Sequence, residues 1–233
     1  MAWVAVLALA VLGSAGPARA ASVADGTLLI ASPELEDPNF AHTVVLVLRN
    51  DTNGAIGVIL NRPTTLVPAK IFPELAASVG SYTGKLFRGG SVASSRLLFL
   101  VRGLAAATVQ GPEVVEKVFL AGDPQALPDI VRLADGTKEL RMYAGHAEWM
   151  PGQLDREIAA GGWQTQPATA EIVFNESPTA LWDQLTKHRG ETVAAAGTRQ
   201  KVAPAIPALP PSMAVASGAV QLVAIPESGR FSR

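Results

Sequence analysis

The sequence predicts an α+β fold: a single compact domain with a mixed, mostly antiparallel sheet flanked by helices. A hairpin lies near the start, where two apolar runs, Thr43–Leu48 and Ala55–Leu60, flank an Asn-Gly pair suited to the positive φ angles of a tight turn. Predicted strands and helices then follow one another without the strict alternation of a parallel sheet. The 233 residues, 48% of them hydrophobic, suffice for one sizeable core.

Apolar and β-branched runs predict the strands. Gly26–Ala31 precedes the hairpin, and the unbroken apolar character of Thr43–Leu48 indicates a strand covered on both faces. Between the strand that ends at Ala144 and the next helix, Gly145–Gly152 is rich in aromatic and turn residues and predicts a loop. The remaining predicted strands are Leu86–Phe87, Arg96–Val101, Val114–Leu120, Glu139–Ala144, Glu171–Phe174 and Ala216–Ile225.

Helices are predicted where apolar residues recur at three- or four-residue spacing or where capping residues occur. Pro68–Val79 has this spacing, and Asp123-Pro124 supplies a cap and a first-turn proline for a helix that ends at Asp135-Gly136. Two further helices are predicted at Gln153–Ala160 and after Ser177-Pro178.

The two ends of the chain differ from the predicted domain at residues 21–190. Residues 1–20 contain the apolar run Trp3–Leu12, too short to span a bilayer, and end in Ala-Arg-Ala, which matches a signal-peptidase site. We therefore expect a cleaved leader and a periplasmic or secreted protein; if the leader is a start-site error, the protein is cytoplasmic. Residues 191–233 are rich in Ala and Pro and predict a flexible tail.

Composition excludes several classes of protein. The chain has no cysteine, so disulfides, thiolate metal sites and lipoprotein anchors are ruled out. A formal net charge of −1 gives little attraction for phosphate backbones, which makes a nucleic-acid partner a poor fit. No phosphate-binding loop, dinucleotide fingerprint or helix-turn-helix signature occurs. We expect no cofactor and no membrane anchor.

Several short segments occur in a recognisable order. They are Leu28–Pro33, Asp37–Phe40, Thr43–Leu46, Gly54–Pro63, Gly89-Gly90 and Gly145–Leu154. Together, over roughly residues 26–189, they resemble the YqgE/AlgH family, also called UPF0301 or DUF179. The resemblance implies a compact α+β domain and, for some members, a label of transcriptional regulator of alginate synthesis; it implies no established reaction.

The chain departs from the family pattern at two loops. Gly89-Gly90-Ser91 stands where the family usually has Gly-Gly-Pro, and Ala144–Trp149 stands where it usually has Gly-Tyr-Ala-Gly-Trp. Most members resemble cytoplasmic proteins without a leader, so an exported relative with altered loops could have a different role.

Candidate binding residues come from polar and aromatic side chains at strand ends. Asn61-Arg62 ends a buried strand, and an arginine there can hold a carboxylate or phosphate bidentately or can satisfy main-chain carbonyls. Trp149 and Gln153 flank a helix start and could line a pocket or pack a loop onto the core.

Gly89, Gly90 and His146 complete the predicted site. The glycine pair lacks the second glycine of a nucleophile elbow, which favours a close backbone approach over catalysis. His146 and Glu148 have the spacing of a zinc-deaminase pair without its cysteines, so we expect no metal site.

Two functions remain open. The first is a non-catalytic binding or regulatory module for a small molecule or a protein, with the ligand at Arg62, Gly89, Gly90, His146 and Trp149; it is a regulator of the AlgH type if the leader is not real. The second is an unrecognised periplasmic hydrolase with His146 or Glu148 as base.

Overall fold

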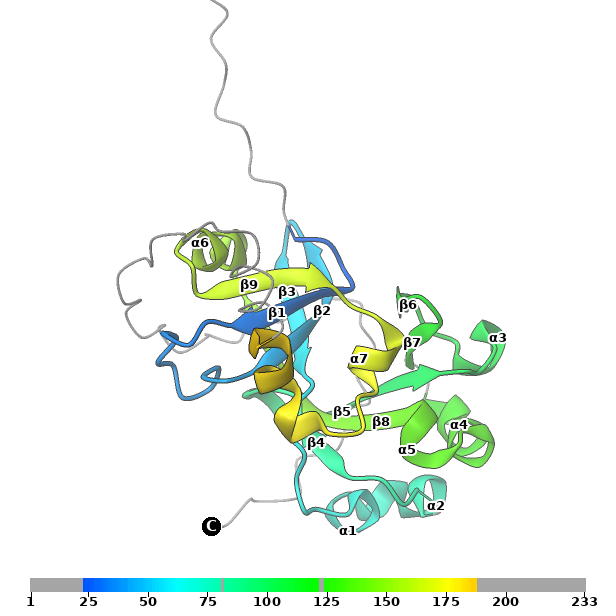
Figure 1. The fold of residues 1–233 in the computed structure, drawn as a ribbon. Helices are drawn as coiled ribbons and strands as arrows, with labels where there is room; N and C mark the ends of the chain where they lie inside the picture. The colour runs from blue at the N-terminus through cyan, green and yellow to red at the C-terminus, as the bar shows by residue number, and fades with distance from the viewer. Residues whose placement is uncertain (1–22, 81, 122–123, 188–233) are drawn as a thin grey trace, which may run out of the picture.

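The computed structural model describes residues 23–80, 82–121 and 124–187. Within these residues the sheet is strongly curled. Some helices pack on its outer faces, and others lie in the open side of the curl (Figure 1). The strands are β1 Thr27–Ala31, β2 Val44–Asp51, β3 Gly54–Ile59, β4 Leu86–Arg88, β5 Val92–Arg102, β6 Glu113–Val115, β7 Val118–Ala121, β8 Leu140–Trp149 and β9 Trp163–Pro167. The predicted leader, the tail and the strand at 216–225 lie outside the described residues.

The helices are short. They are α1 Pro68–Ile71, α2 Ala76–Val79, α3 Ala106–Val109, α4 Leu127–Leu133, α5 Gly136–Glu139, α6 Gln153–Ala159 and α7 Ala170–Val173. Single 3₁₀ turns join or extend them at Pro73–Leu75, Pro124–Ala126 and Pro178–Ala180, and residues 181–187 form a further helical segment.

The sheet confirms the predicted mixed, mostly antiparallel arrangement. Its strand order is β6-β7-β5-β8-β3-β2-β1-β9, with every neighbouring pair antiparallel, while β4 pairs in parallel with β8. The predicted hairpin is formed by β2 and β3. Gly54 follows its turn with a φ of 117°, a backbone conformation that glycine adopts readily. β8 lies at the centre and contacts β3, β4 and β5, so its side chains reach both halves of the curl.

Three apolar clusters form the core, because alternate residues of the same strand face opposite sides of the sheet. One cluster, inside the curl, contains Leu98, Leu100, Tyr143 and Phe174. A second packs the other face of β5 and β8 against α1, α2 and α4, and a third packs β1–β3 against α6. All of Val44–Leu48 is 5% exposed or less, which confirms the prediction of a strand covered on both faces.

The structure corrects four predicted elements. Pro73 interrupts the predicted helix 68–79, because proline cannot donate the helical hydrogen bond. Val114–Leu120 is a tight β6–β7 hairpin that turns at Lys117, whose φ is 60°. The predicted loop at 145–152 is strand β8 as far as Trp149, because its backbone pairs with β3. The β9 strand and α3 were not predicted.

The fourth correction concerns residues 171–174, predicted as a strand and found as helix α7 and its C-cap. The side chain of Thr169 accepts a hydrogen bond from the Ile172 amide and caps the helix. Val173 and Phe174 are then buried in the cluster inside the curl. Capping and burial together outweigh the strand preference of the β-branched residues.

Candidate functional site

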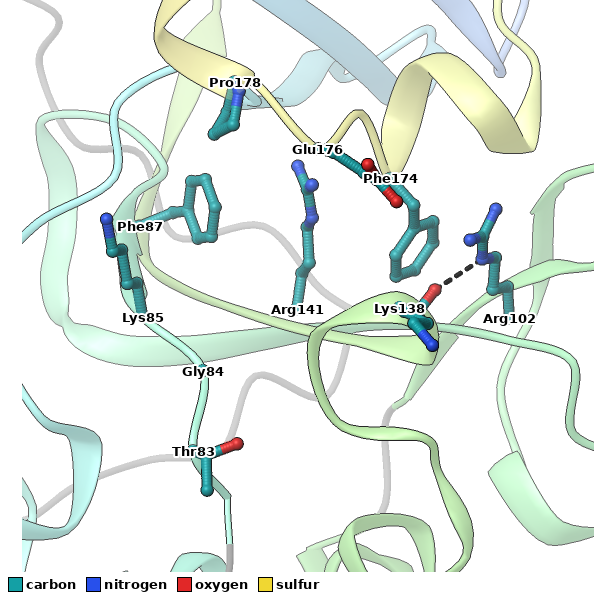
Figure 2. Close-up of a pocket in the computed structure, with 10 residues that line it drawn as sticks. All are labelled: Thr83, Gly84, Lys85, Phe87, Arg102, Lys138, Arg141, Phe174, Glu176 and Pro178. Atoms are coloured by element: carbon teal, nitrogen blue, oxygen red, sulfur yellow. Dashed lines mark hydrogen bonds between the residues drawn. The ribbon is translucent and has the colours of Figure 1, made fainter.

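A pocket of about 420 Å³ opens where β4, β8 and the end of β5 meet the segment after α7. Figure 2 shows the guanidinium of Arg141 at its centre, between Phe87 and Phe174. The ten residues that line the pocket are Thr83, Gly84, Lys85, Phe87, Arg102, Lys138, Arg141, Phe174, Glu176 and Pro178.

The alternation of side chains along β8 places Arg141 in the core. Leu140 and Met142 face the helices of the second apolar cluster, so Arg141 and Tyr143 must face the inside of the curl. Arg141 pairs in register with Leu100, which belongs to the cluster inside the curl. A charged side chain therefore occupies a position that the strand pattern assigns to an apolar residue.

Arg141 is 4% exposed and incompletely paired. Its Nη2 donates a hydrogen bond to the main-chain carbonyl of Asn175, whereas Nε and Nη1 are buried without a partner in the described part of the chain. The guanidinium carbon lies 5.0 Å from the ring centroid of Phe87 and 5.6 Å from that of Phe174, within the range of cation–π attraction. These rings stabilise the charge but accept no conventional hydrogen bond from it.

Tyr143 adds a second buried donor beside Arg141. The ring is fully buried and lies 5.3 Å from Phe87 between centroids, and its hydroxyl has no hydrogen-bond partner among the described residues. Desolvation raises the pKa of Tyr143 to about 12, although the positive charge of Arg141 and an interaction with its side chain act in the opposite direction. The hydroxyl is therefore protonated at neutral pH and available to donate.

The rim of the pocket is positively charged. Lys85, Lys138 and Arg102 line it with Arg141, against one carboxylate, that of Glu176. Arg102 is held in place because its Nε donates to the main-chain carbonyl of Lys138 and its guanidinium lies 4.8 Å from the Phe174 ring centroid. The lysines are exposed, so water screens their charge, while that of Arg141 is little screened.

Asn61 and Arg62, predicted to bind a ligand, contact main-chain groups at the start of β2 and in the loop before it. Asn61 accepts a hydrogen bond from the Val44 amide at 2.9 Å and donates to the His42 carbonyl at 2.8 Å. Arg62 donates from Nη2 to the carbonyls of Pro38 and Ala41, at 3.2 and 3.4 Å. Desolvation lowers the pKa of Arg62, and the neighbouring charge of Arg88 lowers it further.

Gly89 and Gly90 allow two backbones to approach closely. Gly89 donates from its amide to the Ala144 carbonyl and accepts from the Ile59 amide, both at 2.8 Å. A Cβ atom added at Gly90 would lie 2.0 Å from the carbonyl carbon of His146. These contacts bring Gly89, Gly90 and His146 together, although none of the three lines the Arg141 pocket.

His146 is 5% exposed, and its Nε2 lies 3.8 Å from a carboxylate oxygen of Glu148. Burial, assisted by the charge of Arg96, lowers the pKa of His146 to about 4, so the imidazole is neutral at neutral pH. Burial also raises the pKa of Glu148. Across residues 23–80, 82–121 and 124–187, no group of three His, Cys, Asp or Glu side chains is placed to hold a metal ion.

Trp149 and Gln153 converge on a buried carboxylate that the sequence analysis did not identify, that of Glu157. One oxygen of Glu157 accepts hydrogen bonds from the indole Nε1 of Trp149 at 3.0 Å and of Trp163 at 2.9 Å. The other oxygen accepts from Gln153 Nε2 at 2.8 Å. With Trp149 only 1% exposed, this arrangement anchors α6 to the sheet.

The pocket residues themselves were not predicted from the sequence. Arg141 carried a usable signal, because it is a charged residue inside the apolar strand Leu140–Tyr143. The aromatic partners Phe87 and Phe174 lie far from it in sequence and meet it only through the β4–β8 pairing and the position of α7.

The comparison with family models matches residues 28–194 to DUF179, described as AlgH-like. The chain belongs to this AlgH-like family, and the predicted resemblance is confirmed. A UPF0301 protein from Streptomyces avermitilis is 34% identical over 177 residues, covering 74% of this chain and 90% of the relative. One from Streptomyces coelicolor is 36% identical, covering 71% of this chain and 87% of the relative.

Two solved structures share the fold. A crystal structure of a Corynebacterium diphtheriae protein matches with a TM-score of 0.60 and 27% identity, over 71% of this chain and 87% of that one. The solution structure of AlgH from Pseudomonas aeruginosa, a UPF0301 protein, matches with a TM-score of 0.58 and 24% identity, over 79% of this chain and 98% of that one.

In the described part of the chain, no helix is both long and apolar enough to cross a membrane.

Proposed function

We propose that this AlgH-like protein is an exported, non-catalytic binding module that takes a small anionic molecule in the pocket at Arg141. The observation that carries the proposal is the buried guanidinium facing this pocket, with Nε and Nη1 unpartnered among the described residues. Buried charges in proteins are normally paired, and an anion in the pocket would complete the pairing.

Electrostatics around the pocket supports the same proposal. Four of the lining side chains are basic and one is acidic, so the pocket has a positive potential although the whole chain has a net charge of −1. The exposed lysines attract an anion from solution, and the desolvated guanidinium then supplies the directional contact. Attraction and recognition are thus assigned to different residues.

Hydrolysis is the weaker candidate because the predicted bases are poorly placed for it. His146 is 5% exposed, and neither it nor Glu148 lines the Arg141 pocket. A general base must come within hydrogen-bond distance of the proton that it removes. The described contacts of His146 and Glu148 supply no observation in favour of hydrolysis.

Export rests on the sequence of residues 1–20, with their apolar run and Ala-Arg-Ala motif. It determines which ligands the protein would meet. An uncleaved chain in the cytoplasm would instead favour a regulatory role of the AlgH type, with the pocket sensing an intracellular anion.

Native mass spectrometry of the protein isolated from separated periplasm and cytoplasm tests both parts of the proposal. We expect a periplasmic species that lacks residues 1–20 and retains an anionic small molecule. The retained mass should disappear in Arg141→Gln and persist in Arg132→Gln, a matched change at an exposed arginine on α4. An uncleaved cytoplasmic species contradicts export, and a retained molecule indifferent to Arg141→Gln contradicts the assigned pocket.

A further inference from the structure

We propose that the ligand of the Arg141 pocket is a monocarboxylate with a flat, apolar body. This inference rests on the proposed anion-binding function and goes beyond it by naming the chemical class. It follows from the number of buried charges, the shape of the surrounding rings and the kind of donor that Arg141 supplies.

The number of buried charges favours a single negative charge. Arg141 is the cation that the structure buries fully in the pocket, whereas Arg102 is half-buried at the rim, Lys85 and Lys138 are exposed, and Glu176 carries a negative charge on the same rim. A phosphate monoester carries nearly two charges at neutral pH and would leave part of that charge without a buried partner. A carboxylate carries one, which a single buried guanidinium balances through a charge-assisted hydrogen bond.

The rings around Arg141 favour a flat body. Both Phe87 and Phe174 lie within 6 Å of the guanidinium carbon, and Pro178 extends the apolar lining. A planar acid that reaches Arg141 would contact these apolar surfaces, which favour offset stacking or edge-to-face packing. The pocket volume of about 420 Å³ exceeds that of a bare ion and lies within the range of small-molecule sites.

Arg141 is the donor that would distinguish a carboxylate from a neutral amide. Tyr143 lies on the same face of β8 as Arg141 but does not line the pocket. The guanidinium donates only, so an amide of the same shape would place its N–H₂ group against a donor, whereas both oxygens of a carboxylate can accept.

The segment after α7 determines how a carboxylate would reach Arg141. The Asn175 carbonyl accepts the Nη2 hydrogen bond, and Phe174 covers one side of the guanidinium. Because Nε and Nη1 are shielded from water, an entering oxygen must displace part of this cover. Binding should therefore change the environment of residues 174–178 as well as that of Arg141.

Calorimetric titration of the full chain with four probes tests the inference: phenylacetate, phenylacetamide, acetate and phenyl phosphate. We expect phenylacetate to bind at least about tenfold more tightly than each of the other three, because only phenylacetate combines one negative charge with a flat body. Arg141→Gln should abolish the preference for phenylacetate over phenylacetamide, and Phe174→Leu should weaken phenylacetate with little effect on acetate. Arg132→Gln is the control and should change nothing.

The outcomes separate this inference from the proposed function. Equal or tighter binding of phenyl phosphate overturns the carboxylate assignment but leaves the proposed anion site standing. The same conclusion follows if all four probes fail to bind a protein that retains another anion from cells. Binding of phenylacetate that survives Arg141→Gln overturns both the carboxylate assignment and the proposed anion site. Circular dichroism checks that each variant is folded, and Arg141→Lys, which keeps the charge but loses the planar donor pair, should bind phenylacetate no better than phenyl phosphate.

Discussion

Arg141 and Asn175, 34 residues apart in the sequence, are joined by a hydrogen bond from the guanidinium Nη2 to a main-chain carbonyl. This bond links the central strand β8 to the segment that follows α7. It uses one of the three guanidinium nitrogens, and the other two are buried without partners in the described part of the chain. The arrangement makes sense as a binding site, because a buried charge that served stability alone would be expected to be fully paired.

Removal of the buried charge should stabilise the ligand-free protein. In Arg141→Met, the side chain retains an apolar stem of similar length, while the desolvated guanidinium is lost together with its bond to Asn175. We expect the free energy of unfolding to rise by about 1 kcal/mol and anion binding to disappear. Urea denaturation measures the first effect and titration the second; a loss of stability of about 2 kcal/mol or more would assign Arg141 a purely structural role.

Neutralisation of Glu157 should destabilise the protein. Its carboxylate accepts hydrogen bonds from Trp149, Trp163 and Gln153 and is 6% exposed. Glu157→Gln replaces one acceptor with a donor, so at least one of these N–H groups loses its partner, and we expect a loss of about 2–3 kcal/mol. Urea denaturation followed by tryptophan fluorescence measures this loss of stability.

Asp155→Asn on the same helix is the control for Glu157→Gln, and it should change stability by less than about 0.5 kcal/mol. Equal effects of the two variants would show that the three hydrogen bonds to Glu157 contribute little.

His146 should make the protein less stable in acid. Its pKa of about 4 in the folded state lies below the ordinary value of 6.5, so the unfolded chain binds more protons between these two values. The contribution of His146 is complete above pH 6.5 and is lost as the pH falls towards 4, by about 3 kcal/mol in total. Glu148, whose pKa is raised, acts with the opposite sign, so the His146 contribution is isolated by comparison with His146→Asn.

Stability measured at pH 7 and pH 4.5 in wild type and His146→Asn gives the result. The wild type should lose more stability than the variant over this interval. Parallel losses in the two proteins would mean that His146 is protonated equally easily in the folded and unfolded states.

Gly90→Ala tests the close approach of the two backbones. The added Cβ would lie 2.0 Å from His146 main-chain atoms, which cannot move without disturbing β8, and we expect a loss of about 3 kcal/mol or more. Ser91→Ala, at the next and exposed position, should stay within about 0.5 kcal/mol of wild type in thermal denaturation. A Gly90→Ala protein as stable as Ser91→Ala would contradict the tight packing.

The sequence predicted the fold better than the pocket. The β2–β3 hairpin followed from its turn residues, and the burial of Val44–Leu48 from its unbroken apolar character. The strand predicted at residues 171–174 from its β-branched residues was wrong, because capping by Thr169 and burial of Phe174 favour a helix there. The pocket could not be assembled from local pattern, because Phe87, Arg141 and Phe174 meet only through tertiary structure.

The most direct test of the central claim is an NMR titration of the ¹⁵N-labelled protein with phenylacetate, observing the Arg141 Nε–H resonance and the amides of residues 174–178. Occupation of the pocket predicts saturable shifts of these resonances at one common affinity, and their loss in Arg141→Gln but not in Arg132→Gln. Saturable shifts confined to other parts of the protein, or the same shifts in Arg141→Gln, would contradict the assignment of an anion site to Arg141.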